Sequence, residues 1–287
     1  MYRCRLAFSP PFLDARLSQD ELRGDDLMLV RVRQEGGVVD EALDRPRSKR
    51  GADWARLRVV LAGAVGSGVG QVLEAGTVSG GAGWVDEPGR SLGRATDWLD
   101  VYWRVGSSVG ARPSSRCHHR LSPAEHARMI DLARAIAGPE AAARSAAGDV
   151  LDVLRASGAP LERDAIASIA RDVPDQAHAF ARALERSFGR EGEQPMAVDL
   201  SRELGVGERQ IHRRASDHFR RFHLSVSSWR EYVTGIRISV GTFLMSAPDA
   251  RSESVARYLG YSSPSAFCHA LRDHDLPSPQ AIQRAAR

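Results

Sequence analysis

The chain is poor in the residues that build disulfide-rich or metal-bound folds. Its three cysteines, Cys4, Cys117 and Cys268, lie far apart and are odd in number. They predict neither a disulfide framework nor a zinc site, and they favour a reducing cytoplasm. No histidine lies between Met1 and Ala111, so a metal site built on histidines is not expected there.

One cluster of metal-ligating residue types does occur, at Cys117-His118-His119. Adjacent residues point in different directions, so three in a row rarely close on one ion. We therefore interpret the cluster as part of a polar, basic linker from Ala111 to Arg120, and we predict no metal site.

Long apolar runs are missing as well. No segment approaches the roughly 20 apolar residues that span a bilayer, and the first residues, MYRCRLAFSPPF, lack the apolar core of a signal peptide. A cytoplasmic protein without a membrane partner is therefore expected. Hydrophobic residues still make up 43% of the 287 residues, enough for packed cores, and this length favours two domains.

Signatures of catalysis are missing too, since the chain contains no Gly-x-Ser-x-Gly, His-Glu-x-x-His or Cys-x-x-Cys motif. The glycine-rich run Gly63–Gly70 is not followed by Gly-Lys-Ser/Thr, so it is not a phosphate-binding loop. The residues after it indicate a strand and turns, and a β-hairpin is expected instead. We expect neither an enzyme nor a cofactor.

Positive charge is in modest excess. The formal net charge is +4, and Lys49 is the only lysine, a skew typical of a GC-rich genome. Such an excess is compatible with a polyanionic partner but does not require one.

The segment that organises the chain is Ser252–Arg272, near the C-terminus. Its apolar residues follow a helical period on both sides of Gly260, and this glycine can adopt the left-handed conformation that ends a helix. Ser263 can cap a second helix, with Pro264 at the first position, where its missing N–H costs nothing. This is the pattern of a helix-turn-helix. The outward side chains of its second helix are Ser265, Cys268, His269 and Arg272.

The same pattern occurs upstream. Met196–Leu204 predicts a first helix, Gly205–Gly207 a turn, and Glu208–Phe219 a second helix with Ile211 and Ala215 facing inward. The outward residues of this second helix are Arg209, Gln210, His212, Arg213 and Arg214.

Between the two units, the segment Trp229–Met245 has apolar residues at helical spacing and predicts one connecting helix. Two helix-turn-helix units on one helix, with LGVGERQ in the first and ARYLGYSSPSAF in the second, resemble the arabinose-regulator (AraC/XylS) family of bacterial transcription factors. The resemblance covers roughly Asp175 to Arg287. It implies a sequence-specific DNA-binding domain, preceded by a ligand-sensing or dimerising domain that is often a cupin-like β-barrel.

The sequence departs from the family pattern at several points. Gly207 stands where the family usually has a helix-capping Ser, Ser201 replaces an Ala, and His269 replaces a frequent Arg. The segment Arg220–Ser228 is longer than the family's usual turn, and Asp275-Leu276-Pro277 replaces Phe-Gly-Leu. These differences bear on the spacing of the two units and on the end of the domain.

The first 111 residues are rich in glycine and valine, with turn signals between short apolar runs. Four runs are strand-like: Asp26–Arg33, Ala55–Ala62, Gly70–Leu73 and Trp98–Val105. Many short strands with glycine turns indicate a small β-sandwich or barrel, with the basic run Arg45–Arg50 in a solvated loop. Trp84, Trp98 and Trp103 are expected either in its core or around a pocket for an organic effector.

Three helices are predicted between this region and the DNA-binding domain. Ser122-Pro123-Ala124-Glu125 is a capping box that starts the first, which runs to Ala137. The others cover about 139–157 and 162–171. The first carries an apolar stripe that either forms a dimer interface or packs on the β-rich domain. A further helix, from Asp175 to Phe188, begins the DNA-binding domain.

The predicted fold class is α+β. Residues 1–120 form a small β-rich, cupin-like, effector-sensing domain, 121–173 a helical linker and dimerisation region, and 174–287 an all-α DNA-binding domain. In this last domain the helix-turn-helix units cover about 196–219 and 252–274, and the connecting helix covers about 229–246.

Hydrogen-bonding chemistry assigns roles to the outward residues. Arginine can bind guanine O6 and N7, and glutamine can bind adenine N6 and N7. The predicted base contacts of the first unit are Arg209, Gln210 and Arg213, with His212 and Arg214 closer to phosphate. Those of the second unit are Ser263, Ser265, His269 and Arg272. For each of these side chains the alternative is a merely solvated or phosphate-facing group.

The predicted function is regulation of transcription by two units that contact successive major-groove segments about 34 Å apart. The expected partners are double-stranded promoter DNA, RNA polymerase, a small-molecule effector and a second copy of the chain. The alternative is a regulator that acts mainly through protein–protein contacts and binds DNA weakly or without specificity.

Overall fold

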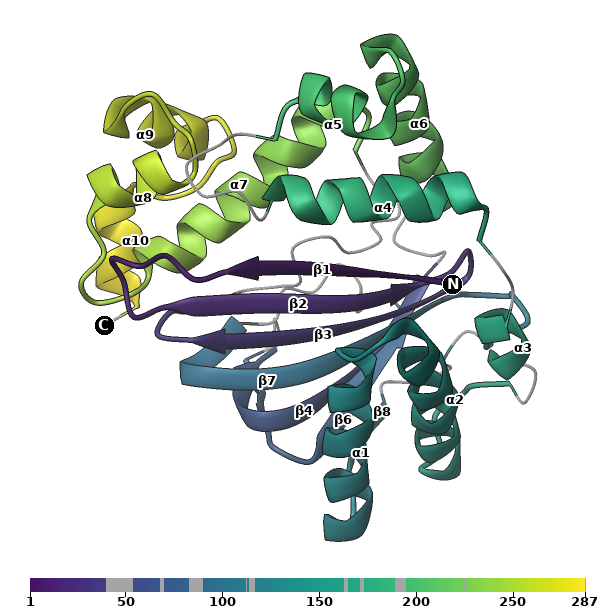
Figure 1. Ribbon diagram of the computed structural model, residues 1–287. Helices are drawn as coiled ribbons and strands as arrows, with labels where there is room; N and C mark the ends of the chain where they lie inside the picture. Colours follow the sequence, from purple (N-terminus) through teal and green to yellow (C-terminus); the bar gives the residue numbers. More distant parts are fainter. Residues whose placement is uncertain are drawn as a thin grey trace.

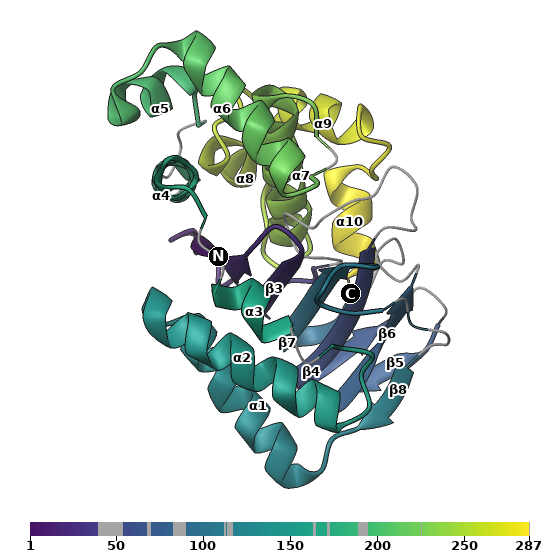
Figure 2. The ribbon, with the colours of Figure 1, turned by 90° about the vertical axis from the view of Figure 1, so that its right-hand side faces the viewer.

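The computed structural model describes residues 1–39, 54–67, 70–82, 90–111, 113, 117–162, 165–170, 173–188, 195–224 and 226–286. An antiparallel β-sheet forms the middle layer, with helices against both of its faces (Figure 1 and Figure 2). The α+β class is confirmed, since an N-terminal antiparallel sheet is followed by a helical C-terminal region.

Eight strands make up the sheet: β1 (Tyr2–Phe8), β2 (Arg16–Arg23), β3 (Leu27–Glu35), β4 (Trp54–Gly66), β5 (Val72–Glu74), β6 (Thr77–Ala82), β7 (Arg90–Arg104) and β8 (Cys117–Arg120). Their order is β1-β2-β3-β7-β4-β6-β8, and β5 pairs with β4. Among the described residues this is one sheet with β1 and β8 outermost, rather than the two sheets of a sandwich. Helices cover both faces, so the strands need no second sheet to bury their apolar side chains.

Each of the four strand-like runs overlaps a strand, namely β3, β4, β5 or β7, although Gly70–Leu73 contributes only its last two residues to β5. The predicted linker Ala111–Arg120 is wrong at its end, because β8 pairs with β6 there. Gly80 lies inside β6. A Cβ on Gly80 would lie 2.0 Å from the carbonyl oxygen of Arg56, so only glycine fits this close approach.

The hairpin expected after the glycine-rich run is confirmed. β4 and β5 pair antiparallel, with Gly66 opposite Val72. The basic run Arg45–Arg50 and Trp84 lie outside the described residues, so their predictions stay untested.

Two helices, α1 (Pro123–Ile136) and α2 (Glu140–Ala156), pack on one face of the sheet, with α3 (Ala165–Ala170) beside α2. The capping box is confirmed, because Ser122 accepts from the Glu125 N–H and the Glu125 carboxylate accepts from the Ser122 N–H. The apolar stripe of α1 is buried against Leu57 and Leu99 of the sheet. Packing on the sheet is therefore the alternative that the structure adopts for this stripe.

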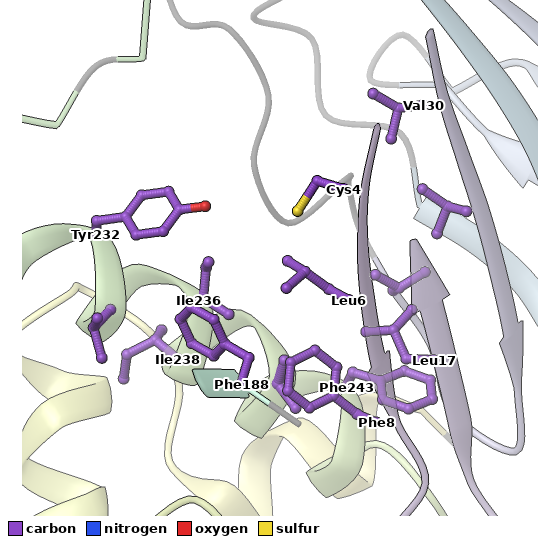
Figure 3. Close-up of a cluster of buried hydrophobic side chains, with 14 of the residues drawn as sticks. Cys4, Leu6, Phe8, Leu17, Val30, Phe188, Tyr232, Ile236, Ile238 and Phe243 are labelled. Atoms are coloured by element: carbon purple, nitrogen blue, oxygen red, sulfur yellow. The ribbon is translucent and has the colours of Figure 1, made fainter. Parts of the chain in front are cut away.

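The opposite face carries the C-terminal helices: α4 (Asp175–Phe188), α5 (Ala197–Leu204), α6 (Glu208–Arg221), α7 (Trp229–Met245), α8 (Ser252–Tyr258), α9 (Pro264–Arg272) and α10 (Pro279–Ala285). Figure 3 shows Leu6, Phe8 and Leu17 of the sheet facing Phe188 and Phe243 of these helices. One continuous core thus joins the sheet to the helix-turn-helix region.

Of the tryptophans expected in the core or around an effector pocket, the two that the structure describes are core residues. Trp98 and Trp103 are fully buried and lie on opposite faces of β7, one in each core. Since five residues along a strand reverse the side-chain direction, they do not line a common effector pocket.

An ion pair is buried in the sheet beneath the C-terminal helices. Asp100 accepts two hydrogen bonds of 2.7 Å from Arg58, one of 3.2 Å from the Trp98 indole and one of 3.1 Å from the Tyr102 hydroxyl. Burial raises the pKa of Asp100, but the charge and hydrogen bonds of Arg58 outweigh it and leave this pKa below its ordinary value. The carboxylate is therefore ionised and fully bonded inside the protein.

Candidate nucleic-acid interface

The first helix-turn-helix consists of α5 and α6. Gly205 ends α5 with φ of 63°, in the left-handed region that favours glycine. No side chain caps α6 at Gly207, as the sequence indicates. The hydroxyl of Ser201 donates to the carbonyl of Val206, so the residue that replaces the family's Ala closes the turn. The unit buries Leu200, Ile211, Ala215 and Phe219.

Most of the predicted contacts on α6 point outward. Four are exposed: Arg209, Gln210, His212 and Arg213. Arg214 is half-buried, so its predicted outward position is corrected. It lies three residues after buried Ile211 and four before buried His218, which places it at the border of the inward face.

The second helix-turn-helix consists of α8 and α9. Gly260 makes the turn with φ of 72°, and the hydroxyl of Ser263 caps α9 by accepting from the Ala266 N–H at 3.1 Å. Both sequence predictions are confirmed, and the Ser263 side chain is thereby committed to the cap and half-buried. One exposed stripe at i, i+3, i+4 and i+7 remains on α9: Ser265, Cys268, His269 and Arg272.

Both units are fixed to α7, which occupies the predicted connecting segment (Figure 1). At its start, the rings of Tyr232 and Phe219 lie 5.1 Å apart. Near its end, the Phe267 ring packs on Gly241, where a Cβ would lie 2.7 Å from the ring. The sequence therefore predicted the connector correctly.

Arg237, in the middle of α7, was not singled out by sequence reasoning. Its Nε donates to the carbonyl of Leu259 at 2.7 Å, and its guanidinium lies 3.9 Å from the centre of the Tyr261 ring. Burial lowers the pKa of Arg237 below its ordinary value. These contacts hold the end of α8 and the turn of the second unit on α7.

The sheet end of α6 is docked on the N-terminal strands. Arg221 donates from Nε and Nη2 to the carboxylate of Asp25 at 2.6 and 3.0 Å. One turn earlier, Nε2 of the buried His218 lies 3.1 Å from the hydroxyl of Tyr2. α6 is therefore exposed at its start and anchored to the N-terminal region at its end. Neither contact was predicted from the sequence.

The buried environment of His218 disfavours its charged form. Burial lowers the pKa of His218 well below its ordinary value, and the positive charges of Arg23 and Arg221 lower it further. Its ring is neutral and packs among Tyr2, Phe180 and Phe222.

The stability of the protein is therefore expected to fall in mild acid. Below about pH 6.5 the unfolded chain binds a proton on His218 while the folded protein does not, so the free energy of unfolding decreases by up to about 1.4 kcal/mol per pH unit. Urea unfolding at about pH 7.5 and about pH 5.5 measures this loss. In His218→Phe the part due to this histidine should vanish. An equal pH dependence in both proteins would contradict the assignment.

The cluster around β8 does not assemble a metal site. Sγ of Cys117 lies 3.3 Å from Nδ1 of His119, but His118 points to the other side of the strand. Burial raises the pKa of the Cys117 thiol and lowers the pKa of His119. In the part of the chain that the structure describes, no three Cys, His, Asp or Glu side chains are arranged to hold an ion.

The described helices include none that is both long and apolar enough to cross a membrane. No protein-family model and no curated protein matches the chain. Among solved structures, the chain is similar to ToxT from Vibrio cholerae, at 10% identity, with 90% of this chain and 97% of ToxT covered and a TM-score of 0.37. It is also similar to the transcriptional regulator CdpR from Pseudomonas aeruginosa, at 18% identity, with 65% of this chain and 45% of CdpR covered and a TM-score of 0.30.

Proposed function

We propose that this chain is a transcription regulator of the AraC/XylS type that binds specific DNA sequences through α6 and α9. One observation carries the proposal: each second helix of the two units presents an exposed polar stripe, and α7 holds both units in a fixed relation. Such a pair of recognition helices fits two segments of the major groove. The sequence resemblance in the same region supports the same function.

The residues of the two stripes take different roles in this proposal. On α6, Arg209, Gln210 and Arg213 contact base edges, and His212 contacts phosphate. On α9, Ser265 and His269 contact bases and Arg272 contacts a base or the adjacent phosphate. Ser263 contributes mainly by starting α9, because its hydroxyl is bound to the Ala266 N–H.

The function is tested by selecting binders from random duplex DNA with the full chain. Anisotropy titrations of the selected duplex at several salt concentrations then separate specific from phosphate-driven binding. A bipartite motif, bound at least about a thousandfold more tightly than scrambled DNA, is expected. Weak, strongly salt-dependent binding without a motif would favour the alternative, a regulator that acts mainly through protein contacts.

Replacing Arg209 or Gln210 with alanine is expected to weaken binding to the selected duplex by about 1–3 kcal/mol, because a bidentate contact to one base is lost. The preference for that base should relax at one position of the motif, which selection with the variant measures. Arg134→Ala, at an exposed arginine of α1 on the other face of the sheet, is the control and should leave affinity unchanged. If both stripe variants retain full affinity and preference, α6 does not contact bases.

The remaining partners stay predictions: RNA polymerase, a second copy of the chain, and a small-molecule effector. Because the core joins sheet and helices, an effector bound in either region could alter the orientation of α6. The cytoplasmic location expected from the sequence accords with this function.

A further inference from the structure

A hollow of about 170 Å³ lies between the first turns of α4 and the sheet end of α6. One side of it is lined by Pro174, which directly precedes α4, and by Gln176, Ala177 and Phe180 of α4. From α6 it is lined by Arg214, Asp217, His218 and Arg221. The four α6 residues are spaced i, i+3, i+4 and i+7, so they form one face of this helix. Of these four, only Arg214 was assigned a contact by the sequence, namely a DNA phosphate.

The charge of the hollow is positive. Arg221 is neutralised by Asp25, and Asp217 accepts from Arg220 at 2.7 Å. Arg214 is half-buried, and among the described residues it has no ion-pair partner. Its guanidinium is therefore the positive charge that an occupant can contact. This charge favours a carboxylate or another small anion as the occupant.

His218 supplies a second, independent observation. Its side chain is 5% exposed, and its Nδ1 is buried without a hydrogen-bond partner in the described part of the protein. When the Tyr2 hydroxyl donates to Nε2, Nδ1 carries the hydrogen and offers it to an acceptor. A buried donor left unbonded is costly. Because Nδ1 is shielded from solvent, an occupant accepts from it only after a small shift of the His218 ring toward the hollow.

The rest of the lining is apolar, with the Phe180 ring and the methyl group of Ala177. A dry cavity of about 150 Å³ holds a body the size of benzene. We infer that this hollow binds a small organic acid, with its carboxylate on Arg214 and the Nδ1 of His218 and a body of about six carbons against Phe180. This inference adds a ligand site on the first recognition helix.

A DNA phosphate is the competing occupant, because Arg214 was predicted near phosphate. The position of the hollow argues against it. The hollow lies at the end of α6 that is docked on Asp25 and Tyr2, whereas Arg209 and Gln210 are at the opposite, exposed end. A phosphate also gains no favourable contact from the apolar side of the hollow.

The test is isothermal titration calorimetry of the full chain with 4-methylpentanoate, its neutral amide and inorganic phosphate. The acid is expected to bind, and the amide to bind at least about tenfold more weakly because it lacks the charge. Arg214→Met should weaken binding of the acid at least about tenfold. Ala177→Leu fills the hollow with a residue of high helix propensity and should abolish binding with the fold retained. Arg134→Met is the matched control and should bind like the parent protein.

Three results would overturn the inference: no heat with the acid, unchanged binding in Arg214→Met, or phosphate that binds as tightly as the acid. The last would assign Arg214 to phosphate instead. The binding measurement involves no DNA, so it stands apart from the proposed function. Only the consequence that the acid alters DNA affinity rests on that function, and a chain that binds the acid but no DNA would contradict the function alone.

Discussion

Replacing Asp100 with alanine is expected to lower the free energy of unfolding by about 3–5 kcal/mol. The variant leaves the guanidinium of Arg58, which is 1% exposed, without its carboxylate inside the sheet. Removing one partner of a buried ion pair costs far more than the net value of the pair, because water cannot replace the lost carboxylate. The indole of Trp98 and the hydroxyl of Tyr102 lose their acceptor as well.

Urea unfolding followed by circular dichroism measures this loss. Glu253→Ala is the control, since it breaks an exposed pair with Arg257 and should cost less than about 0.5 kcal/mol. The double variant Asp100→Leu with Arg58→Met should recover most of the stability, because two apolar side chains replace two charges. A loss below about 1 kcal/mol in Asp100→Ala would mean that water reaches Arg58 after the substitution.

Replacing Phe267 with alanine is expected to cost about 3–5 kcal/mol and to disable the second DNA-binding unit. The ring is fully buried, packs on Gly241 of α7 and lies 5.3 Å from the Tyr261 ring. Without the ring, a cavity lies between α9 and α7, so α9 loses its fixed orientation. Affinity for a bipartite duplex should fall by more than about tenfold, while the half-site of α6 remains bound.

Anisotropy with the full duplex and with each half-site separates these effects. Phe12→Ala is the control, because this ring is 43% exposed and contacts Tyr258 from the sheet side. Its cost should stay within about 0.5 kcal/mol. If Phe267→Ala binds the full duplex normally, α9 is not a DNA-contacting helix in this protein.

Local chemistry in the sequence was sufficient to predict the caps and turns. Ser122, Ser263, Gly205 and Gly260 take the expected roles, because capping and left-handed turns depend on the residue itself. The same signal was present for α10, where Ser278 caps and a proline follows. This helix was not predicted from the sequence.

Tertiary relations were less predictable. β1 does carry a strand signal, because apolar Tyr2, Cys4, Leu6 and Phe8 alternate with polar residues. β2 has only two apolar residues, and the burial of Gln19, Asp20 and Glu21 depends on partners that only the fold supplies. The sequence predicted an outward position for Arg214 and gave no position for His218, and helical period alone does not name a neighbour for either residue. That neighbour is β1 for His218 and α4 for Arg214, and both are set by the fold of distant segments.

The anchoring of α6 at one end makes this helix a lever. Fourteen residues give an arm of about 21 Å. A rotation of about 5° at the Asp25 and Tyr2 end would displace the opposite end by about 2 Å, whereas a functional site tolerates about 0.5 Å. A small change in the first two strands is thereby magnified at Arg209 and Gln210, without any change in the shape of the helix.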